Sequence, residues 1–282
     1  ALQADPKATS ALAQSISGYA RSSPGYFADT QKRLRQFVDG GQLGIFANGY
    51  WGHPGYKLPP EANLMALAHY LDALVWQREA VKLHAIFGGK NPHPNFLVGG
   101  APSPISAGPG SAGAAATTLN IVALEEVRSI IRSMQAFVDQ VYLPDTLAIA
   151  GFYKDWFARG EGVGNFLTVG DFPSDGSADA ASNLIPAGVV VGRDLSHIEP
   201  LDLRDPQQVQ EFVAHSWYDY AGGKAQGLHP HAGQTRLHYS GPQPPYEQLD
   251  VAGGYSWMKA PRWRGKPVED GPLARLAVLY AS

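Results

Sequence analysis

The clearest hydrophobic pattern in the chain lies between residues 120 and 143. Apolar side chains recur there at alternating steps of three and four residues, at Leu124, Val127, Ile131, Met134, Val138 and Val141. This spacing places them on one face of an α-helix, and Asn120 is a suitable N-cap. Pro144 should kink or end this helix, although residues 147–156 have a sequence that can continue it.

A second long helix is predicted from residue 61 to residue 87. It follows two prolines and begins with Glu61, an acid that the first turn of a helix favours. Its predicted apolar face, interrupted by Arg78, consists of Leu67, Leu71, Leu74, Val81 and Ala85. Shorter helices are expected at 8–18 and 27–38, and a connection rich in Gly, Ala, Ser and Pro at 98–118 should form an ordered covering loop. Two long amphipathic helices joined by a loop indicate a helical bundle.

The residue pattern changes after Gly160 from long helical periods to short predicted strands. Short strands are predicted at 165–170, 188–191 and 194–198, one helix at 207–217, and an irregular excursion at 219–250. We therefore expect a mainly α fold in three segments. They are a helical bundle at 1–158, a peripheral strand- and loop-rich region with one helix at 159–250, and a return to the core at 251–282.

Composition narrows the class of protein. The 282 residues are 44% hydrophobic and carry a net charge of −3, which gives no indication of nucleic-acid binding. No apolar run approaches 18 residues, and the first residues show no signal peptide. The chain contains no cysteine, which excludes disulfides and thiolate metal sites within it.

A rigid loop follows the predicted helix 61–87. Gly88 and Gly89 can end that helix because glycine adopts positive φ readily. Pro92 and Pro94 flank His93 and should hold the residue before each proline in extended geometry. Such a histidine can present one N–H to a fixed acceptor, although an ordinary rigid loop with a surface histidine also explains the pattern.

This loop belongs to a run, LHAIFGGKNPHP at 83–94, that resembles the large subunit of nickel–iron hydrogenases. The resemblance is strongest to the membrane-bound uptake type and extends over the whole chain. Further matching runs lie at 4–10, 23–27, 48–52, 58–64, 152–156, 212–218, 255–263 and 271–275. It implies the long-helix bundle of these subunits and the reversible oxidation of dihydrogen to protons and electrons.

In that family, two CxxC motifs, one near each terminus, hold a nickel–iron centre with CO and cyanide ligands. Neither motif is present, so we expect an internal segment that is inactive by itself and forms one structural domain with its flanks. The resemblance also implies an iron–sulfur small subunit as partner and a membrane cytochrome b as a further one. It places the enzyme at the membrane, on the periplasmic side, through the small subunit's export signal. A non-redox structural or interaction module descended from the family is the alternative, and flanking CxxC motifs would decide against it.

The resemblance assigns one candidate site. The histidine matching His93 lies at the small-subunit boundary near an iron–sulfur cluster, and Lys90 and Asn91 are its neighbours. Hydrogen bonds and positive charge near cluster sulfurs raise the cluster potential. No catalytic residue and no metal ligand is assigned.

The remaining candidates are weaker. Metal binding by the histidines lacks a supporting motif, the adjacent acids diverge on a helix, and the glycine loop matches the phosphate-loop pattern incompletely. These candidates are His215, His229, His231 and His238, Glu125 and Glu126, and the loop at 160–164. The Ala-Pro-Arg run ending at Arg262 matches a non-catalytic copy of the family motif. For Arg262 we expect a buried ion pair or a cation–π contact with an aromatic such as Trp263.

Overall fold

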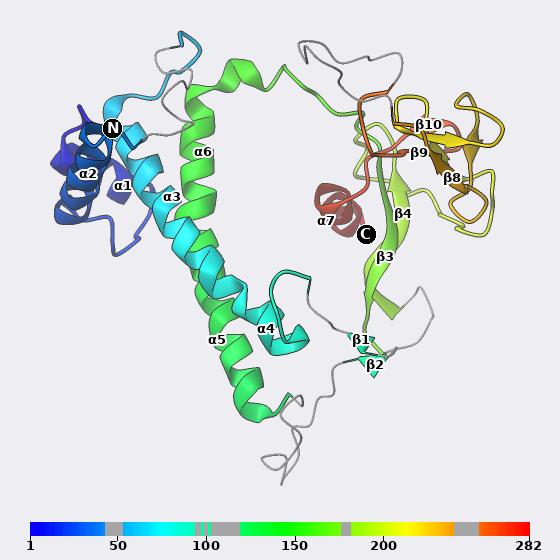
Figure 1. Ribbon diagram of the computed structural model, residues 1–282, viewed down its shortest axis with the longest axis horizontal. Helices are drawn as coiled ribbons and strands as arrows, with labels where there is room; N and C mark the ends of the chain where they lie inside the picture. Colours follow the sequence, from blue (N-terminus) through cyan, green and yellow to red (C-terminus); the bar gives the residue numbers. More distant parts are fainter. Residues whose placement is uncertain (43–52, 94–96, 99–100, 103–118, 176–181, 240–253) are drawn as a thin grey trace. The chain divides into compact units, whose positions relative to one another are not determined.

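The computed structural model describes residues 1–42, 53–93, 97–98, 101–102, 119–175, 182–239 and 254–282. It contains two compact units, unit 1 at 1–159 and unit 2 at 160–282 (Figure 1). Unit 1 consists mainly of helices and unit 2 mainly of strands. The described residues are therefore mixed α and β as a whole, so the expectation of a mainly α fold is confirmed only in part, for unit 1. None of the described helices combines the length and the apolar character needed to cross a membrane.

The helices of unit 1 begin where local sequence favours them. In chain order they are α1 (Pro6–Ile16), α2 (Pro24–Asp39), α3 (Pro60–Ala80), α4 (Lys82–Gly88), α5 (Ile121–Phe137) and α6 (Leu143–Phe152). The side chains of Asp5, Ser23 and Asn120 accept a first-turn N–H of α1, α2 and α5 at 2.8, 3.2 and 3.0 Å. The prediction of Asn120 as an N-cap is confirmed. Two very short strands, β1 (Leu97–Val98) and β2 (Ala101–Pro102), also belong to unit 1.

The predicted helix 61–87 is divided at Val81 into α3 and α4, and its predicted buried face is wrong. The residues of α3 that are buried are Ala62, Leu64, Met65, Ala68, His69 and Asp72. Leu71 and Leu74 of the predicted face are 36% and 45% exposed. The small side chains of Ala62 and Ala68 let neighbouring helices approach closely, and polar partners hold His69 and Asp72 inside.

The helix predicted to start at Asn120 passes Pro144 without ending. A π-helical turn, Val138–Tyr142, joins α5 to α6. Pro144 has no N–H to donate to the carbonyl of Gln140, four residues earlier. The hydroxyl of Ser17, in the chain after α1, donates to that carbonyl instead. The wider turn accommodates the proline ring, so the predicted continuation beyond it is confirmed through Phe152.

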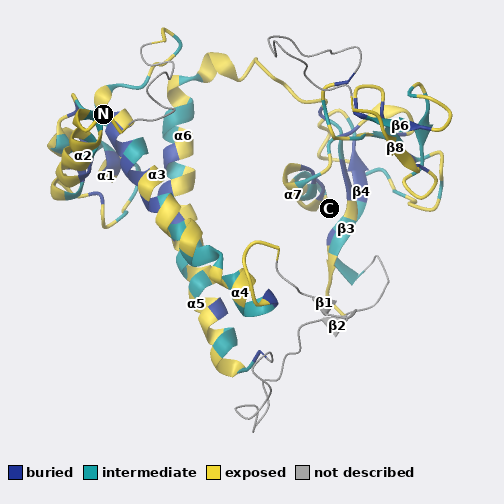
Figure 2. Cartoon of the chain, in the orientation of Figure 1, coloured by how far each residue is buried: buried dark blue, intermediate teal, exposed yellow. Residues whose placement is uncertain are grey.

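The sheets of unit 2 are small and antiparallel. Its strands are β3 (Phe166–Pro173), β4 (Asn183–Val190), β5 (Val209–Phe212), β6 (Tyr218–Tyr220), β7 (Gly227–Leu228), β8 (Thr235–Leu237), β9 (Ala260–Trp263) and β10 (Lys266–Pro267). β3 pairs with β4, β6 with β8, and the four-stranded sheet has the order β10-β9-β5-β7. The main apolar cluster consists of Leu167, Val189, Val209, Trp263 and Val268. The C-terminal helix α7 (Pro272–Ala281) packs on β3 and β4, and Figure 2 shows buried residues gathered there.

Two predicted elements of unit 2 were wrong. The segment 207–217 contains the strand β5 where a helix was expected, because it pairs with β9 about 50 residues later in the chain. The segment 194–198 is a turn, since the carboxylate of Asp194 accepts the N–H of Ser196 at 3.0 Å. The predicted strands at 165–170 and 188–191 correspond to β3 and to the end of β4. Of the predicted connection at 98–118, residues 99–100 and 103–118 lie outside the described residues. Of the predicted irregular excursion at 219–250, residues 240–250 lie outside them, and the earlier part contains most of β6 and all of β7 and β8.

Candidate functional site

The loop after α4 contains the three residues of the candidate site. Gly89 ends α4 with φ +74°, and its N–H donates to the carbonyl of Ala85, as the glycine pattern predicted. The peptide bond between Asn91 and Pro92 is cis. Lys90, Asn91 and His93 are exposed, so their side chains are accessible from outside unit 1.

The backbone of His93 differs from the expectation. The proline after it predicts an extended conformation, but His93 has φ +58°. Histidine tolerates this left-handed region more often than branched residues do, at a cost of about 1–3 kcal/mol. The bend at residues 89–93 lets the chain turn back toward α4. Such a conformation at an exposed histidine is a feature typical of functional loops.

His84 holds this bend from α4. Its Nδ1 lies 2.9 Å from Oδ1 of Asn91. An amide oxygen accepts hydrogen bonds only, so the Nδ1–H of His84 is the donor. No pattern in the sequence indicated this contact, although only seven residues separate the two partners. His84 therefore fixes the side chain of Asn91, two residues before His93.

The histidines of unit 2 do not converge on a common site. The Nε2 of His229 lies 2.9 Å from the carbonyl of Leu203, and its Nδ1 accepts the N–H of His231 at 3.3 Å. Backbone partners thus occupy both nitrogens of His229. His215 stacks on Tyr255. Within the described residues, no group of three or more His, Asp or Glu side chains is arranged to hold a metal ion.

The acidic pair and the glycine loop both have partners in the chain itself. Glu125 forms an exposed ion pair with Arg128 one helical turn away. In the loop at 160–164, the N–H of Gly164 donates to the Glu269 carboxylate at 3.2 Å. A carboxylate of the chain therefore lies where a phosphate loop would bind its ligand.

Arg262 makes a cation–π contact, but not with the expected aromatic ring. Its guanidinium carbon lies 5.4 Å from the ring centroid of Phe212, on the neighbouring strand β5. Trp263 receives Arg264 instead, at 4.7 Å. Successive residues of a strand point to opposite faces, so adjacent Arg262 and Trp263 do not meet face to face.

Sequence reasoning missed a buried polar chain in unit 1. The Nδ1 of His69 lies 2.7 Å from Oδ2 of Asp145, and its Nε2 lies 3.1 Å from the hydroxyl of Ser22. A carboxylate only accepts, so Nδ1–H donates to Asp145, and Nε2 shares a second hydrogen bond with the Ser22 hydroxyl. This order of groups resembles a hydrolase triad, but the Ser22 residue is only 1% exposed and cannot reach a substrate. These linked polar side chains connect α3, α6 and the segment before α2.

A second polar group adjoins this chain. The hydroxyl of Tyr19 donates to Asp72 at 3.0 Å, and Arg21 forms an ion pair with the same carboxylate at 3.0 Å. Burial, followed by the negative charge of Asp72, raises the pKa of Tyr19 to about 12. Burial is also the main cause of a raised pKa at Tyr26, whose hydroxyl donates to the carbonyl of Ala68 at 2.8 Å. The sequence contains a sign of these groups, because the predicted apolar face of the helix does not account for the polar residues His69 and Asp72.

Comparison with known proteins identifies the family. A family model described as nickel-dependent hydrogenase matches residues 1–282. The chain belongs to this family. It is 54% identical to the uptake hydrogenase large subunit of Rhizobium leguminosarum bv. viciae, over all of this chain and 48% of that protein. It is 51% identical to the hydrogenase-1 large chain of Escherichia coli K12, over 99% of this chain and 48% of that one.

A solved structure of the nickel-dependent hydrogenase family has a similar fold. The as-isolated, oxidized nickel–iron–selenium hydrogenase of D. vulgaris Hildenborough aligns with 98% of this chain and 57% of its own chain. The TM-score is 0.59 at 26% identity. This chain spans about half the length of the curated relatives it matches.

The side chains present do not fit a nickel–iron centre held by thiolates. Thiolate sulfur is the ligand that such soft metal sites use, and the sequence contains no cysteine. Within the described residues, both ring nitrogens of His69 and His229 have partners, and no group of three or more His, Asp or Glu side chains could replace the four sulfurs. The described residues therefore form packed helices and the exposed loop after α4. No metal ligand is assigned among them.

Proposed function

We propose that this chain forms part of the large, catalytic subunit of a nickel–iron hydrogenase of the uptake type. The complete subunit would oxidise dihydrogen reversibly to protons and electrons at a nickel–iron centre with CO and cyanide ligands. The observation that carries the proposal is the 54% identity to an uptake hydrogenase large subunit over the full length of this chain. Identity of this extent along the whole chain supports a shared activity more strongly than a shared fold does.

The proposal includes an iron–sulfur small subunit as the partner that takes up the electrons. A membrane cytochrome b would be the next acceptor. The enzyme would lie at the membrane, on the periplasmic side, through the export signal of the small subunit. The relatives are named large subunits of uptake hydrogenases, which supports a smaller partner subunit. The cytochrome b and the periplasmic side rest on the family resemblance alone.

A chimeric large subunit tests the proposed activity. This chain replaces the matching half of the R. leguminosarum relative, which is produced with its own small subunit and maturation proteins. We expect hydrogen-dependent dye reduction, with nickel bound to the chimera. A chimera that assembles and binds nickel but does not oxidise hydrogen would contradict the proposal and favour a non-redox module.

The 282-residue chain by itself provides the complementary measurement. Because it has no thiolate, we expect it to bind far less than one nickel per chain and to show no hydrogen uptake. Elemental analysis after gel filtration measures this. One tightly held nickel per purified chain would show that the ligands lie within this sequence.

The proposal also assigns a role to the exposed loop at 90–93. In the assembled enzyme, a ring N–H of His93 donates to a sulfur of the nearest iron–sulfur cluster, and Lys90 and Asn91 lie at the same boundary. The exposure of these side chains and the left-handed backbone of His93 support this role. A hydrogen bond to the cluster stabilises its reduced, more negative form.

His93→Ala in the chimera tests this role. The potential of the nearest cluster should fall by about 20–60 mV, because the lost hydrogen bond is worth roughly 0.5–1.5 kcal/mol. A redox titration followed by electron paramagnetic resonance measures the shift. His197→Ala, at an exposed histidine of unit 2, is the matched control and should leave the potential unchanged. An unshifted potential with normal nickel content would leave His93 as an ordinary surface residue.

A further inference from the structure

The C-terminal helix α7 has two apolar faces. Ala274 and Val278 are buried against β3 and β4. On the outer side, Leu273, Leu276 and Tyr280 are 61%, 62% and 81% exposed. A helix at a protein surface normally has polar residues on its outer side, and a helix that is apolar all round is typical of the interior of a larger structure.

The single charged residue of α7 does not change this picture. Arg275 forms an ion pair with Asp171 on β3 at 2.7 Å, so it serves the contact with the sheet. No other residue of the helix sequence, PLARLAVLYA, carries a charge. The outer face of α7 thus offers water almost no polar side chain to solvate.

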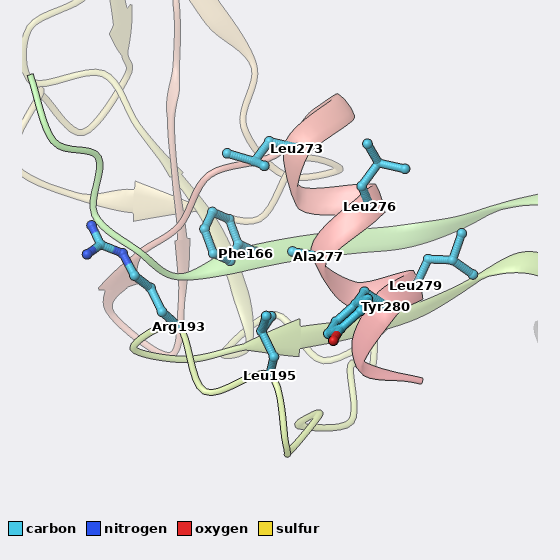
Figure 3. A pocket seen from close by; sticks show the side chains of 8 residues that line it. All are labelled: Phe166, Arg193, Leu195, Leu273, Leu276, Ala277, Leu279 and Tyr280. Carbon is cyan, nitrogen blue, oxygen red and sulfur yellow. The ribbon is translucent and has the colours of Figure 1, made fainter. Parts of the chain in front are cut away.

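A groove of about 740 Å³ runs along this outer face. Leu276 and Tyr280 line it from α7, and Phe166 and Leu195 line it from the start of β3 and the turn after β4 (Figure 3). Arg193 is the one charged residue in the lining, and it pairs with Glu161. The lining therefore resembles a domain core more than an exchangeable protein interface, which normally has a polar rim.

We propose that this groove binds an apolar segment from the other half of the same large subunit. The relatives match this chain over 48% of their length, so each contains as much polypeptide again within one subunit. A segment of the same polypeptide reaches the groove at a high effective concentration and needs no charged steering. The proposal rests on membership of the family and on the groove, and it is independent of the proposed activity.

The lack of cysteine makes a direct test possible. Leu276→Cys introduces the first cysteine of the 282-residue sequence, in the groove, and Leu237→Cys introduces a matched one at a leucine of β8 that is 71% exposed. Each is placed in the 282-residue chain and in the chimeric large subunit described above. Maleimide labelling is followed by mass spectrometry of the peptides that carry the two sites.

We expect both sites to react rapidly in the 282-residue chain. In the chimera, labelling at position 276 should be at least tenfold slower than at position 237. Equal rates at the two positions in the chimera would overturn the proposal. Protection of position 276 that rises with the concentration of the 282-residue chain would also overturn it, because a second copy would then be the occupant. Protection that requires the small subunit would overturn it in favour of that partner.

A charge in the groove gives a second, independent measurement. Leu276→Asp should leave the thermal transition of the 282-residue chain unchanged, since the side chain is exposed there. In the chimera it should lower the yield of assembled large subunit severalfold, and Leu237→Asp should not. Equal yields for the two variants would count against the groove as a buried surface.

Discussion

The two units bury different kinds of core. The buried polar side chains of unit 1 are Thr9, Ser10, Ser22, Thr30, His69, Asp72 and Asp145, whereas those of unit 2, within the described residues, are Thr168 and Ser216. Unit 1 also buries an apolar cluster that includes Phe27, Leu64 and Met65, whereas the core of unit 2 is built around valines such as Val189, Val190 and Val278, all with no exposed surface. Directional hydrogen bonds specify how the helices of unit 1 meet, and strand register with apolar packing specifies unit 2. A defect in unit 1 should therefore leave an unpaired polar group, and a defect in unit 2 should leave a cavity.

The largest effect is expected where a polar partner of unit 1 is removed. His69→Ala leaves the Asp145 carboxylate buried without its donor, and removing one partner of a buried pair costs about 3–5 kcal/mol. Urea unfolding gives the free energy, and hydrogen exchange of α3 amides locates the loss in unit 1. Tyr70→Ala, at the next and exposed residue, is the control. A cost below 1 kcal/mol would mean that the polar chain does not specify the packing of unit 1.

A cavity in unit 2 should cost less. Val189→Ala removes two methyl groups that are fully buried, and transfer plus cavity terms amount to about 2 kcal/mol. The same urea unfolding experiment measures it, with hydrogen exchange of β3 and β4 amides as the local readout. Leu184→Ala, at an exposed leucine of the same strand, should change stability by less than about 0.5 kcal/mol. Loss of protection in α3 as well would show that the two units do not unfold separately.

A smaller effect is expected at the proline in the long helix. Ser17→Ala removes the donor to the carbonyl of Gln140, which should cost about 0.5–1.5 kcal/mol. Pro144→Ala restores a helical N–H for that carbonyl, so Ser17→Ala should cost almost nothing in its presence. A double-mutant cycle measures this coupling. Additive costs would indicate that the carbonyl has another donor, such as solvent.

The last effect is absent at neutral pH and is a loss of stability at high pH to which Tyr19 of unit 1 contributes. The pKa of Tyr19 is about 12 in the folded chain and about 10 in an unfolded one. The unfolded state therefore loses this proton first, so stability is complete below pH 10 and decreases as the pH rises from about 10 to about 12. Tyr19→Phe should make this decrease shallower, and Tyr280→Phe, at an exposed tyrosine, should not. An identical decrease in both variants would assign the effect to other groups.

Local signals were sufficient for several elements. Asn120 and Gly89 were assigned correctly because a cap depends on a few neighbouring residues. The strand β5 was missed because its partner β9 is distant in sequence, and pairing across that distance overrides local preference. The buried face of α3 was missed because it includes His69 and Asp72, whose partners come from other segments. The exposed loop at 90–93 was identifiable, but its contact with His84 was not, because that contact depends on the bend that turns the loop back toward α4.

The polar chain of unit 1 also sets an order of events during synthesis. Ser22 and His69 are 47 residues apart, and His69 and Asp145 are separated by a further 76. Ribosomes add about 5–20 residues per second, so His69 lacks its carboxylate acceptor for roughly 4–15 s after it is made. During that interval α1, α2 and α3 can associate through apolar contacts, but an imidazole within them has no acceptor at Nδ1. The nascent chain therefore completes this junction only when α6 arrives.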